Sequence, residues 1–192
     1  MTKKERSLKA YAAQIRSVIV AAPHTAAIVR ELIQFGVGSP DVLIARTPEE
    51  ALDVLAHQRR NLMFIAIGSE PIDAMSLIRT IRRGHANVPR NLPIIAMTEA
   101  PTKSLAEQLR DLGVNEILVV PVTAQHLTDR IKSVFEKPRD WVFTDHYVGP
   151  DRRRKKNEDA RKKKRRSSDE DAFDDAMTLT DALNDVDSET RH

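Results

Sequence analysis

Short apolar runs alternate with segments of helical periodicity over the first 137 residues of this chain. Five apolar runs are present, at 17–21, 42–45, 62–67, 93–97 and 116–120. Five segments with apolar residues at helical spacing follow them, at 25–35, 47–55, 72–83, 102–112 and 123–135. Continuous apolar runs of this length are typical of parallel strands that are covered on both faces. The alternation therefore predicts an α/β fold with a five-stranded, doubly wound parallel sheet, and it favours the flavodoxin-like strand order 2-1-3-4-5.

Local signals mark the ends of the predicted helices. The segment 47–50 (Thr-Pro-Glu-Glu) combines a capping threonine, a proline in the first turn and a glutamate three residues after the cap. Gly113 follows the segment 102–112, at a position where helices commonly stop. In the helix predicted at 25–35, the spacing places Ile28 and Phe35 on the buried face.

Composition changes sharply after residue 150. All 6 glycines and all 10 prolines lie between residues 23 and 150, and Phe173 is the only aromatic residue beyond them. A segment so poor in apolar residues buries too little surface to offset its ordering entropy. We therefore expect four parts. They are an N-terminal helix or arm at 1–13, a folded domain at 14–137, an aromatic linker at 138–150 and a disordered tail at 151–192.

The charge of the predicted tail is divided into two blocks. Residues 151–166 carry a net charge of +8 and residues 167–192 carry −8, although the whole chain has only +3. Lysines and arginines in such a block suit phosphate backbones, acidic lipid surfaces or the acidic block that follows. The sequence leaves these three partners open. The candidate anion-binding residues are Arg152, Arg153, Arg154, Lys155, Lys156, Arg161, Lys162, Lys163, Lys164, Arg165 and Arg166.

Two apolar features of the C-terminal part also have two interpretations each. Trp141, Phe143 and Tyr147 alternate roughly at strand spacing, which favours packing along the folded body, with stacking on nucleotides as the alternative. The acidic end has apolar residues at helical spacing from Phe173 to Val186. They suit either a short helix that docks into a partner groove or a disordered acidic tail, because an isolated helix of this length is marginal.

Several function classes lack their sequence signatures. The chain has no cysteine, so disulfides and thiolate chemistry are excluded. No apolar stretch approaches the ~18 residues of a membrane span, and the first residues lack an apolar signal core, so we expect a cytoplasmic protein. Phosphate-binding glycine motifs and the hydrolase motif G-x-S-x-G are also absent. We therefore expect no cofactor, no metal and no enzymatic activity.

The chain resembles the receiver domains of response regulators over residues 14–137. The segment 92–98 (Leu-Pro-Ile-Ile-Ala-Met-Thr) is similar to that family's fourth strand, which ends in Thr or Ser. The segment 112–117 (Leu-Gly-Val-Asn-Glu-Ile) resembles the approach to its fifth strand, and Pro121 stands where the family has a proline after its lysine. The resemblance implies the same doubly wound fold.

The residues at the family's active-site positions differ from its pattern. Ala21 and Ala22 stand where the acidic pair is expected, Ala66 stands at the phospho-acceptor position, and Val120 replaces the lysine. Aspartyl phosphorylation needs a carboxylate nucleophile, and Mg²⁺ prefers carboxylate ligands. The positions supply neither, and Val120 cannot offset the phosphate charge. The resemblance thus implies a pseudo-receiver, whose stability we expect not to depend on Mg²⁺.

Two further positions concern the switch that receivers use. Ile117 replaces the family's aromatic switch residue, whereas Thr98 matches the family. Thr98 is either a retained switch element or a strand-end threonine bonded to nearby backbone. At the same predicted edge of the sheet, His24, Glu70 and Glu99 leave open whether any ligand binds there.

The leading hypothesis is a phosphorylation-independent signalling adaptor that acts by protein–protein interaction in a bacterial two-component-type pathway. In receivers the partner surface often comprises the fourth helix, the fifth strand and the fifth helix, which correspond here to 102–112, 116–120 and 123–136. The alternative is a nucleic-acid-associated regulatory protein that binds through the basic tail. Homodimerisation remains open. The candidate partner-surface residues are Leu105, Leu109, Ile117, Val119, Gln125 and Arg130.

Overall fold

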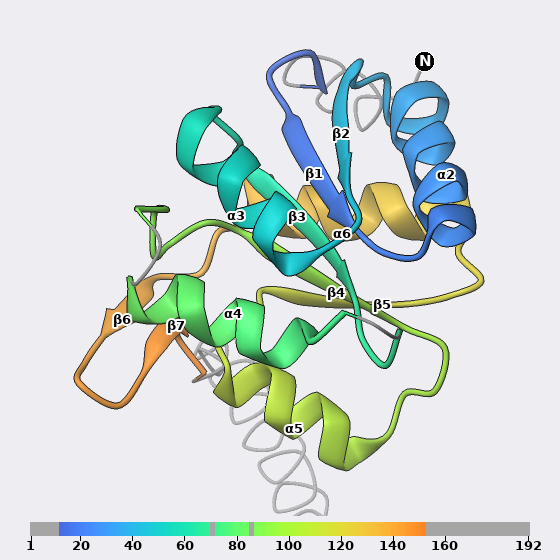
Figure 1. The fold of residues 1–192 in the computed structure, drawn as a ribbon. Coiled ribbons are helices and arrows are strands. Elements are labelled where there is room, and N and C mark those ends of the chain that lie inside the picture. Colours follow the sequence, from blue (N-terminus) through green and yellow to red (C-terminus); the bar gives the residue numbers. More distant parts are fainter. Residues whose placement is uncertain (1–11, 70–71, 85–86, 153–192) are drawn as a thin grey trace, which may run out of the picture. The chain divides into compact units, whose positions relative to one another are not determined.

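The computed structural model describes residues 12–69, 72–84 and 87–152 (Figure 1). Five strands form one parallel sheet in the order β2-β1-β3-β4-β5. The fold class and strand order expected from the sequence are thus confirmed. The strands are β1 (Arg16–Val20), β2 (Asp41–Ala45), β3 (Leu62–Ala66), β4 (Ile94–Thr98) and β5 (Glu116–Val119).

Helices cover both faces of this sheet. One apolar cluster joins β1, β3 and β4 to α2, η1 and α6, and a second joins the same strands to α3, α4 and α5. β3 and β4 are buried along their whole length, because they lie inside the sheet between the two layers. The helices are α2 (Pro23–Glu31), η1 (Leu32–Val37), α3 (Pro48–His57), α4 (Ala74–Arg83), α5 (Lys103–Asp111) and α6 (Ala124–Glu136).

Side-chain caps set the start of four helices. Thr47, Asp73, Thr102 and Thr123 each accept a hydrogen bond from a backbone N–H three residues later. Glu50 completes the first cap, since its carboxylate accepts the N–H of Arg46 at 2.8 Å. Such caps satisfy N–H groups that have no partner within the helix. None of the helices in the described ranges is long and apolar enough to cross a membrane.

The helix after β1 corrects one expectation. α2 continues into η1, a π-helical segment in which Ile33 and Val37 are buried. The wider π-helical turn changes which residues face the sheet. Phe35, expected on the buried face, is therefore 86% exposed. Ile28 was expected on the same face, but Ala26 and Val29 form the buried side of α2, and Ile28 is 44% exposed.

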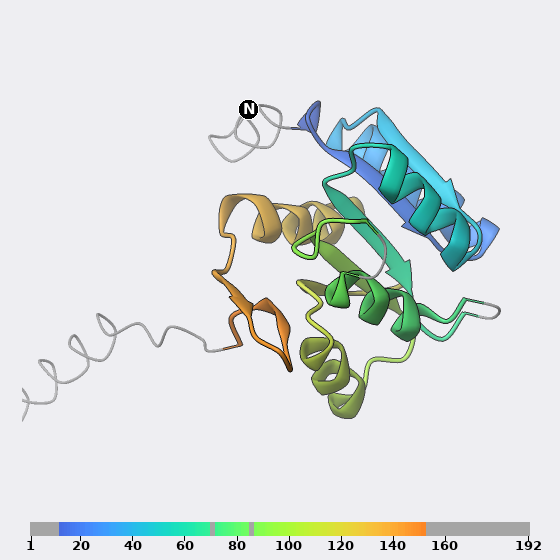
Figure 2. The same ribbon diagram turned by 60° about the vertical axis from the view of Figure 1, so that its left-hand side comes forward.

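Residues 138–150, interpreted from the sequence as a linker, contain two paired strands. β6 (Trp141–Phe143) and β7 (Val148–Pro150) form an antiparallel hairpin. Asp151 extends the pairing by donating its N–H to the carbonyl of Asp140 at 2.7 Å. Figure 2 shows this hairpin apart from the five-stranded sheet, and Figure 1 shows it beside α4, against which β7 packs. The N-terminal arm up to residue 11 and the tail from residue 153 lie outside the described residues.

Candidate functional site

The carboxyl edge of the sheet is apolar at the positions where receivers hold their active site. Ala21 and Ala66 follow or end neighbouring strands and are 1% and 7% exposed. Val120, directly after β5, packs against the same apolar cluster. Ala22 is half-buried and caps α2 without a side-chain hydrogen bond. These four side chains offer no oxygen or nitrogen atom to a metal or a phosphoryl group.

The polar residues near this edge do not assemble into a metal site. Within the described ranges, no group of three His, Asp or Glu side chains could hold a metal ion. His24 and Glu99 are exposed, and Glu70 lies outside the described residues. The buried Thr98 hydroxyl accepts a hydrogen bond from the N–H of Ala100 at 3.3 Å. This bond supports the interpretation of Thr98 as a strand-end threonine that satisfies nearby backbone.

Part of the expected partner surface is unavailable. Leu109 is fully buried, because it faces the apolar cluster between α5 and the sheet. Its inclusion in the surface is therefore corrected. Leu105 and Ile117 are half-buried and pack against the same cluster, whereas Val119 is 46% exposed.

The polar members of that surface lie on α6. Gln125 bonds to Asp129 on the same helix at 3.0 Å. Arg130 reaches across to Glu116 at the start of β5, with 3.2 Å between Nη1 and Oε2. The α6 side of β5 therefore carries polar and charged groups, whereas Val119 lies on the opposite face of the sheet.

A buried arginine links α4 to the C-terminal hairpin. Arg82 is 4% exposed, yet it belongs to a helix whose other buried residues are apolar. Its Nε and Nη2 donate to the carbonyl of Gly113 at 3.1 and 2.9 Å. Its Nη1 donates to the carbonyls of Arg90 and Leu92 at 2.8 and 2.9 Å, so backbone oxygens accept nearly all of its N–H groups.

Desolvation is the main influence on the guanidinium of Arg82. Burial lowers the pKa of Arg82 to about 9, and the nearby Tyr147 acts in the opposite direction. The guanidinium also lies over the Trp141 ring, 5.0 Å from its centroid. A cation held between carbonyl dipoles and an aromatic face keeps its proton at neutral pH. Arg82 thus brings a positive charge into the contact between helix and hairpin.

A close backbone contact completes this junction. Gly113 has φ +83°, and a Cβ there would lie 2.2 Å from the carbonyl oxygen of Val148. A Cβ at Gly149 would lie 2.6 Å from the Cα of Gly113. The hairpin can therefore approach the loop before β5 only because both positions lack a side chain.

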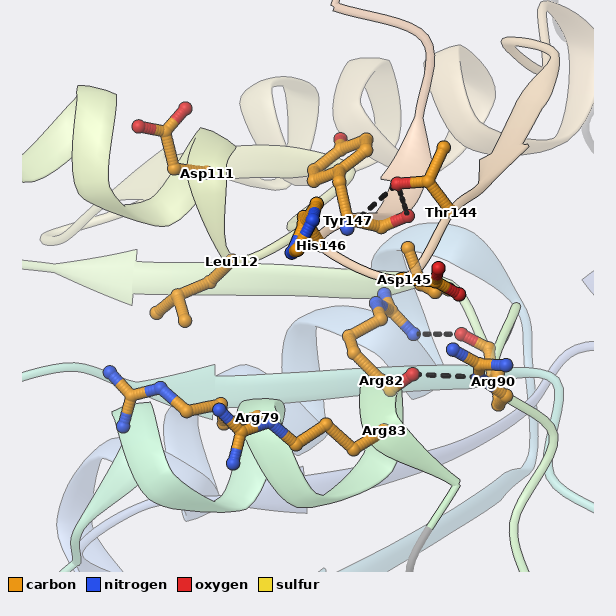
Figure 3. Close-up of a pocket in the computed structure, with 11 residues that line it drawn as sticks. Arg79, Arg82, Arg83, Arg90, Asp111, Leu112, Thr144, Asp145, His146 and Tyr147 are labelled. Atoms are coloured by element: carbon orange, nitrogen blue, oxygen red, sulfur yellow. Dashed lines mark hydrogen bonds between the residues drawn. The ribbon is translucent and has the colours of Figure 1, made fainter.

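An open pocket lies between α4 and the turn of the hairpin (Figure 3). Its volume is about 340 Å³. Figure 3 shows Arg82 pointing toward the hairpin turn. The side chains of Arg79 and Arg83 extend along α4, on the α4 side of the pocket. The lining residues are Arg79, Arg82, Arg83, Arg90, Asp111, Leu112, Thr144, Asp145, His146, Tyr147 and Val148.

Arg152 is the one member of the expected anion-binding tail that the described part of the chain includes. It pairs with Asp111 at 3.1 Å, and its guanidinium lies 3.7 Å from the centroid of the Tyr147 ring. Arg152 is thus held against the body. The other basic residues of that set, from Arg153 to Arg166, lie outside the described residues.

Neither Arg82 nor the pocket is among the site residues that the sequence pattern predicts. One signal was available, because Arg82 stands four residues after Ile78 and shares its side of α4. The partners of Arg82 come from three distant segments, and local spacing cannot bring these together.

The structure is similar to solved response-regulator receiver domains. A CheY-like receiver domain from Methanospirillum hungatei has 18% sequence identity and a TM-score of 0.55, covering 65% of this chain and 95% of that chain. Chemotaxis protein CheY4 of Vibrio cholerae has 16% identity and a TM-score of 0.56, with 63% and 99% covered. No protein-family model and no curated protein matches the sequence.

A third similar structure contains a magnesium ion. The receiver domain of sensor histidine kinase PA1611 from Pseudomonas aeruginosa has 19% identity and a TM-score of 0.52, covering 62% of this chain and 95% of that chain. That protein coordinates a magnesium ion in its active-site cleft. Similarity at this level of identity concerns the fold. The described part of this chain therefore has the fold of response-regulator receiver domains, a five-stranded parallel sheet in the order 2-1-3-4-5 between two layers of helices.

Proposed function

We propose that this protein is a signalling adaptor that works without phosphorylation and acts through protein–protein contacts. The receiver-like fold suggests two-component signalling. Fold alone does not define an activity. The specific proposal therefore rests on the site and on the exposed surface.

The observation that carries the proposal is the apolar carboxyl edge. Ala66 ends β3 in a buried position, and Ala21 and Val120 pack in the cluster beside it. A phosphoryl acceptor needs a carboxylate, and its magnesium needs oxygen ligands. An edge filled with alanine and valine supports a domain that keeps one conformation and presents one constant surface.

The surface of α5, β5 and α6 is the proposed contact for a partner. β5 is the last strand of the sheet, so its outer edge has no neighbouring strand. Val119 exposes 46% of its surface on this strand, on the opposite face of the sheet from Glu116, whose carboxylate pairs with Arg130 on α6. An exposed apolar side chain on an edge strand gives a partner both an apolar contact and unpaired backbone groups.

Treatment with a small phosphoryl donor tests phosphorylation independence. The full chain is incubated with acetyl phosphate and Mg²⁺, and its intact mass is measured beside an active receiver domain as positive control. We expect no added phosphoryl group on this chain. Stoichiometric labelling that survives neutral pH but is released by hydroxylamine would identify an acyl phosphate and refute the proposal.

Affinity capture with matched variants tests the adaptor role. The full chain, Val119→Asp and Ile28→Asp are used as baits in host lysate, each with and without nuclease. Ile28 is a matched control because it is 44% exposed and lies on α2. We expect the same proteins with the full chain and with I28D, regardless of nuclease, and loss of capture with V119D. Loss on nuclease treatment alone supports the nucleic-acid alternative instead.

A further inference from the structure

The pocket between α4 and the hairpin has an excess of positive charge. Four arginines line it, against the two carboxylates of Asp111 and Asp145. Asp111 is already paired with Arg110 at 3.4 Å and with Arg152 at 3.1 Å. The negative charge of Asp111 is therefore largely offset by two arginines that do not line the pocket.

Arg79 and Arg83 are available to a ligand. They stand four residues apart on α4, so they lie on the same side of the helix. Both are exposed, and neither forms an ion pair with any carboxylate in the described ranges. Figure 3 shows their side chains extending in the same direction.

Arg90 adds a third guanidinium from a different segment. Its Nε donates to the carbonyl of Arg82 at 2.8 Å, and Arg82 donates back to the carbonyl of Arg90. This reciprocal pair holds the backbone of the loop before β4 against the end of α4. Arg90 lines the pocket, and its hydrogen bond to the carbonyl of Arg82 uses only its Nε.

The C-terminal end of a helix does not account for this cluster. A cation in the last turn of a helix is stabilised by the helix dipole, which concerns Arg82 and Arg83. Arg79 lies one turn earlier, and Arg90 belongs to another segment. Four cations around one pocket repel one another, and a bound anion offsets that repulsion.

We infer that this pocket binds an organic phosphate of about nucleotide size, held by Arg79, Arg83 and Arg90. Guanidinium groups bind phosphate oxygens through paired, charge-assisted hydrogen bonds. A volume of about 340 Å³ lies within the usual range for small-molecule sites. The buried Arg82 lines the same pocket, and its positive charge adds to the attraction for an anion. The ligand contacts both α4 and the turn of the hairpin.

Calorimetry on the full chain tests this inference. The probes are pyrophosphate and ADP, with adenosine as the uncharged comparison. We expect saturable one-to-one binding of pyrophosphate and ADP, no binding of adenosine, and weaker binding at higher salt. Absence of saturable binding below about 1 mM probe overturns the inference. Equal binding of adenosine and ADP also overturns it, since phosphate recognition is then excluded.

Matched charge variants separate the pocket from the basic block of residues 151–166. Arg79→Gln/Arg83→Gln removes two charges from the pocket, and Lys162→Gln/Lys163→Gln removes two from the block. The pocket variant is expected to weaken ADP binding about tenfold or more, and the block variant to leave it within about twofold. Thermal unfolding of both variants without ligand confirms that they are folded. If the block variant weakens binding and the pocket variant does not, the inference is overturned.

Discussion

The guanidinium of Arg82 lies 5.0 Å from the centroid of the Trp141 ring, joining a helix of the α/β domain to the hairpin that follows it. The same guanidinium donates to the carbonyls of Gly113, Arg90 and Leu92. One side chain thus links α4, the loops before β4 and β5, and the hairpin. Loss of this residue affects all of these segments together, because each of them contacts the same guanidinium.

Arg82→Met is expected to lower the free energy of unfolding by about 2–4 kcal/mol. Methionine keeps the length of the side chain but leaves buried carbonyls without donors, and each such group costs about 1–3 kcal/mol. The substitution also removes a buried charge, which offsets part of this decrease in the free energy of unfolding. Urea denaturation followed by the fluorescence of Trp141, the only tryptophan, measures the change. Arg30→Met, an exposed arginine in the last turn of α2, serves as control and is expected within about 0.5 kcal/mol of the native chain.

The pH dependence of stability carries a second signature of Arg82. Burial lowers the pKa of Arg82 to about 9, well below its value in the unfolded chain. Between these values the unfolded chain binds more protons, so the contribution of Arg82 to folding stability rises with pH there and is flat below it. The difference in unfolding free energy between the native chain and R82M is therefore expected to stay constant from pH 6 to 8 and to grow in favour of the native chain above pH 9. A difference that shrinks above pH 9 would contradict this assignment.

Gly113→Ala is expected to cost about 2–4 kcal/mol and to displace the hairpin. The new Cβ would meet the Val148 carbonyl oxygen at 2.2 Å, and the backbone there has φ +83°. The emission of Trp141 reports displacement of the hairpin in the folded state. Gly68→Ala separates strain from clash, since Gly68 has φ +77° with nothing within 4 Å of its Cβ. It is expected to cost only about 1 kcal/mol, and equal costs at both glycines would argue against the close contact.

The strands and most helices follow from sequence patterns because their causes are local. Runs such as 62–67 are apolar throughout, since β3 is covered on both faces. The cap at Thr47 could be predicted from the sequence, because its hydrogen bond joins residues only three positions apart. The buried face of η1 could not be predicted, because the sequence pattern assumes regular α-helical turns, whereas η1 has π-helical turns and exposes Phe35.

The two candidate sites also differ in how far the sequence predicts them. The apolar edge could be inferred from single positions, since Ala66 and Val120 lie at the ends of strands that the pattern identifies. The pocket could not be inferred from the sequence. Arg79, Arg90 and the hairpin turn line the same pocket only because residues 138–150 fold back onto α4. The burial of Leu109 likewise depends on how α5 is rotated against the sheet.

Ala66→Asp is expected to destabilise the protein by about 2–4 kcal/mol without creating a phosphorylation site. The new carboxylate would lie in a position that is 7% exposed and surrounded by apolar side chains. Neither Ala21 nor Val120 provides a metal ligand or a cation beside it. Ala106→Asp, on the exposed side of α5, is the matched control and is expected to change stability by less than about 0.5 kcal/mol. Urea denaturation measures both variants, and labelling of A66D by acetyl phosphate would contradict the expectation.

Paired alanine substitutions test the rotated face of the helix after β1. Ile33→Ala is expected to cost about 2–5 kcal/mol, because Ile33 is fully buried in η1 and its removal leaves a cavity. Phe35→Ala is expected to stay within about 0.5 kcal/mol, because Phe35 is 86% exposed and loses few contacts. A regular α-helix with Phe35 on its buried face predicts a cost of about 3–5 kcal/mol for F35A. Urea denaturation of the two variants therefore distinguishes the π-helical segment from the regular helix that the sequence pattern predicts.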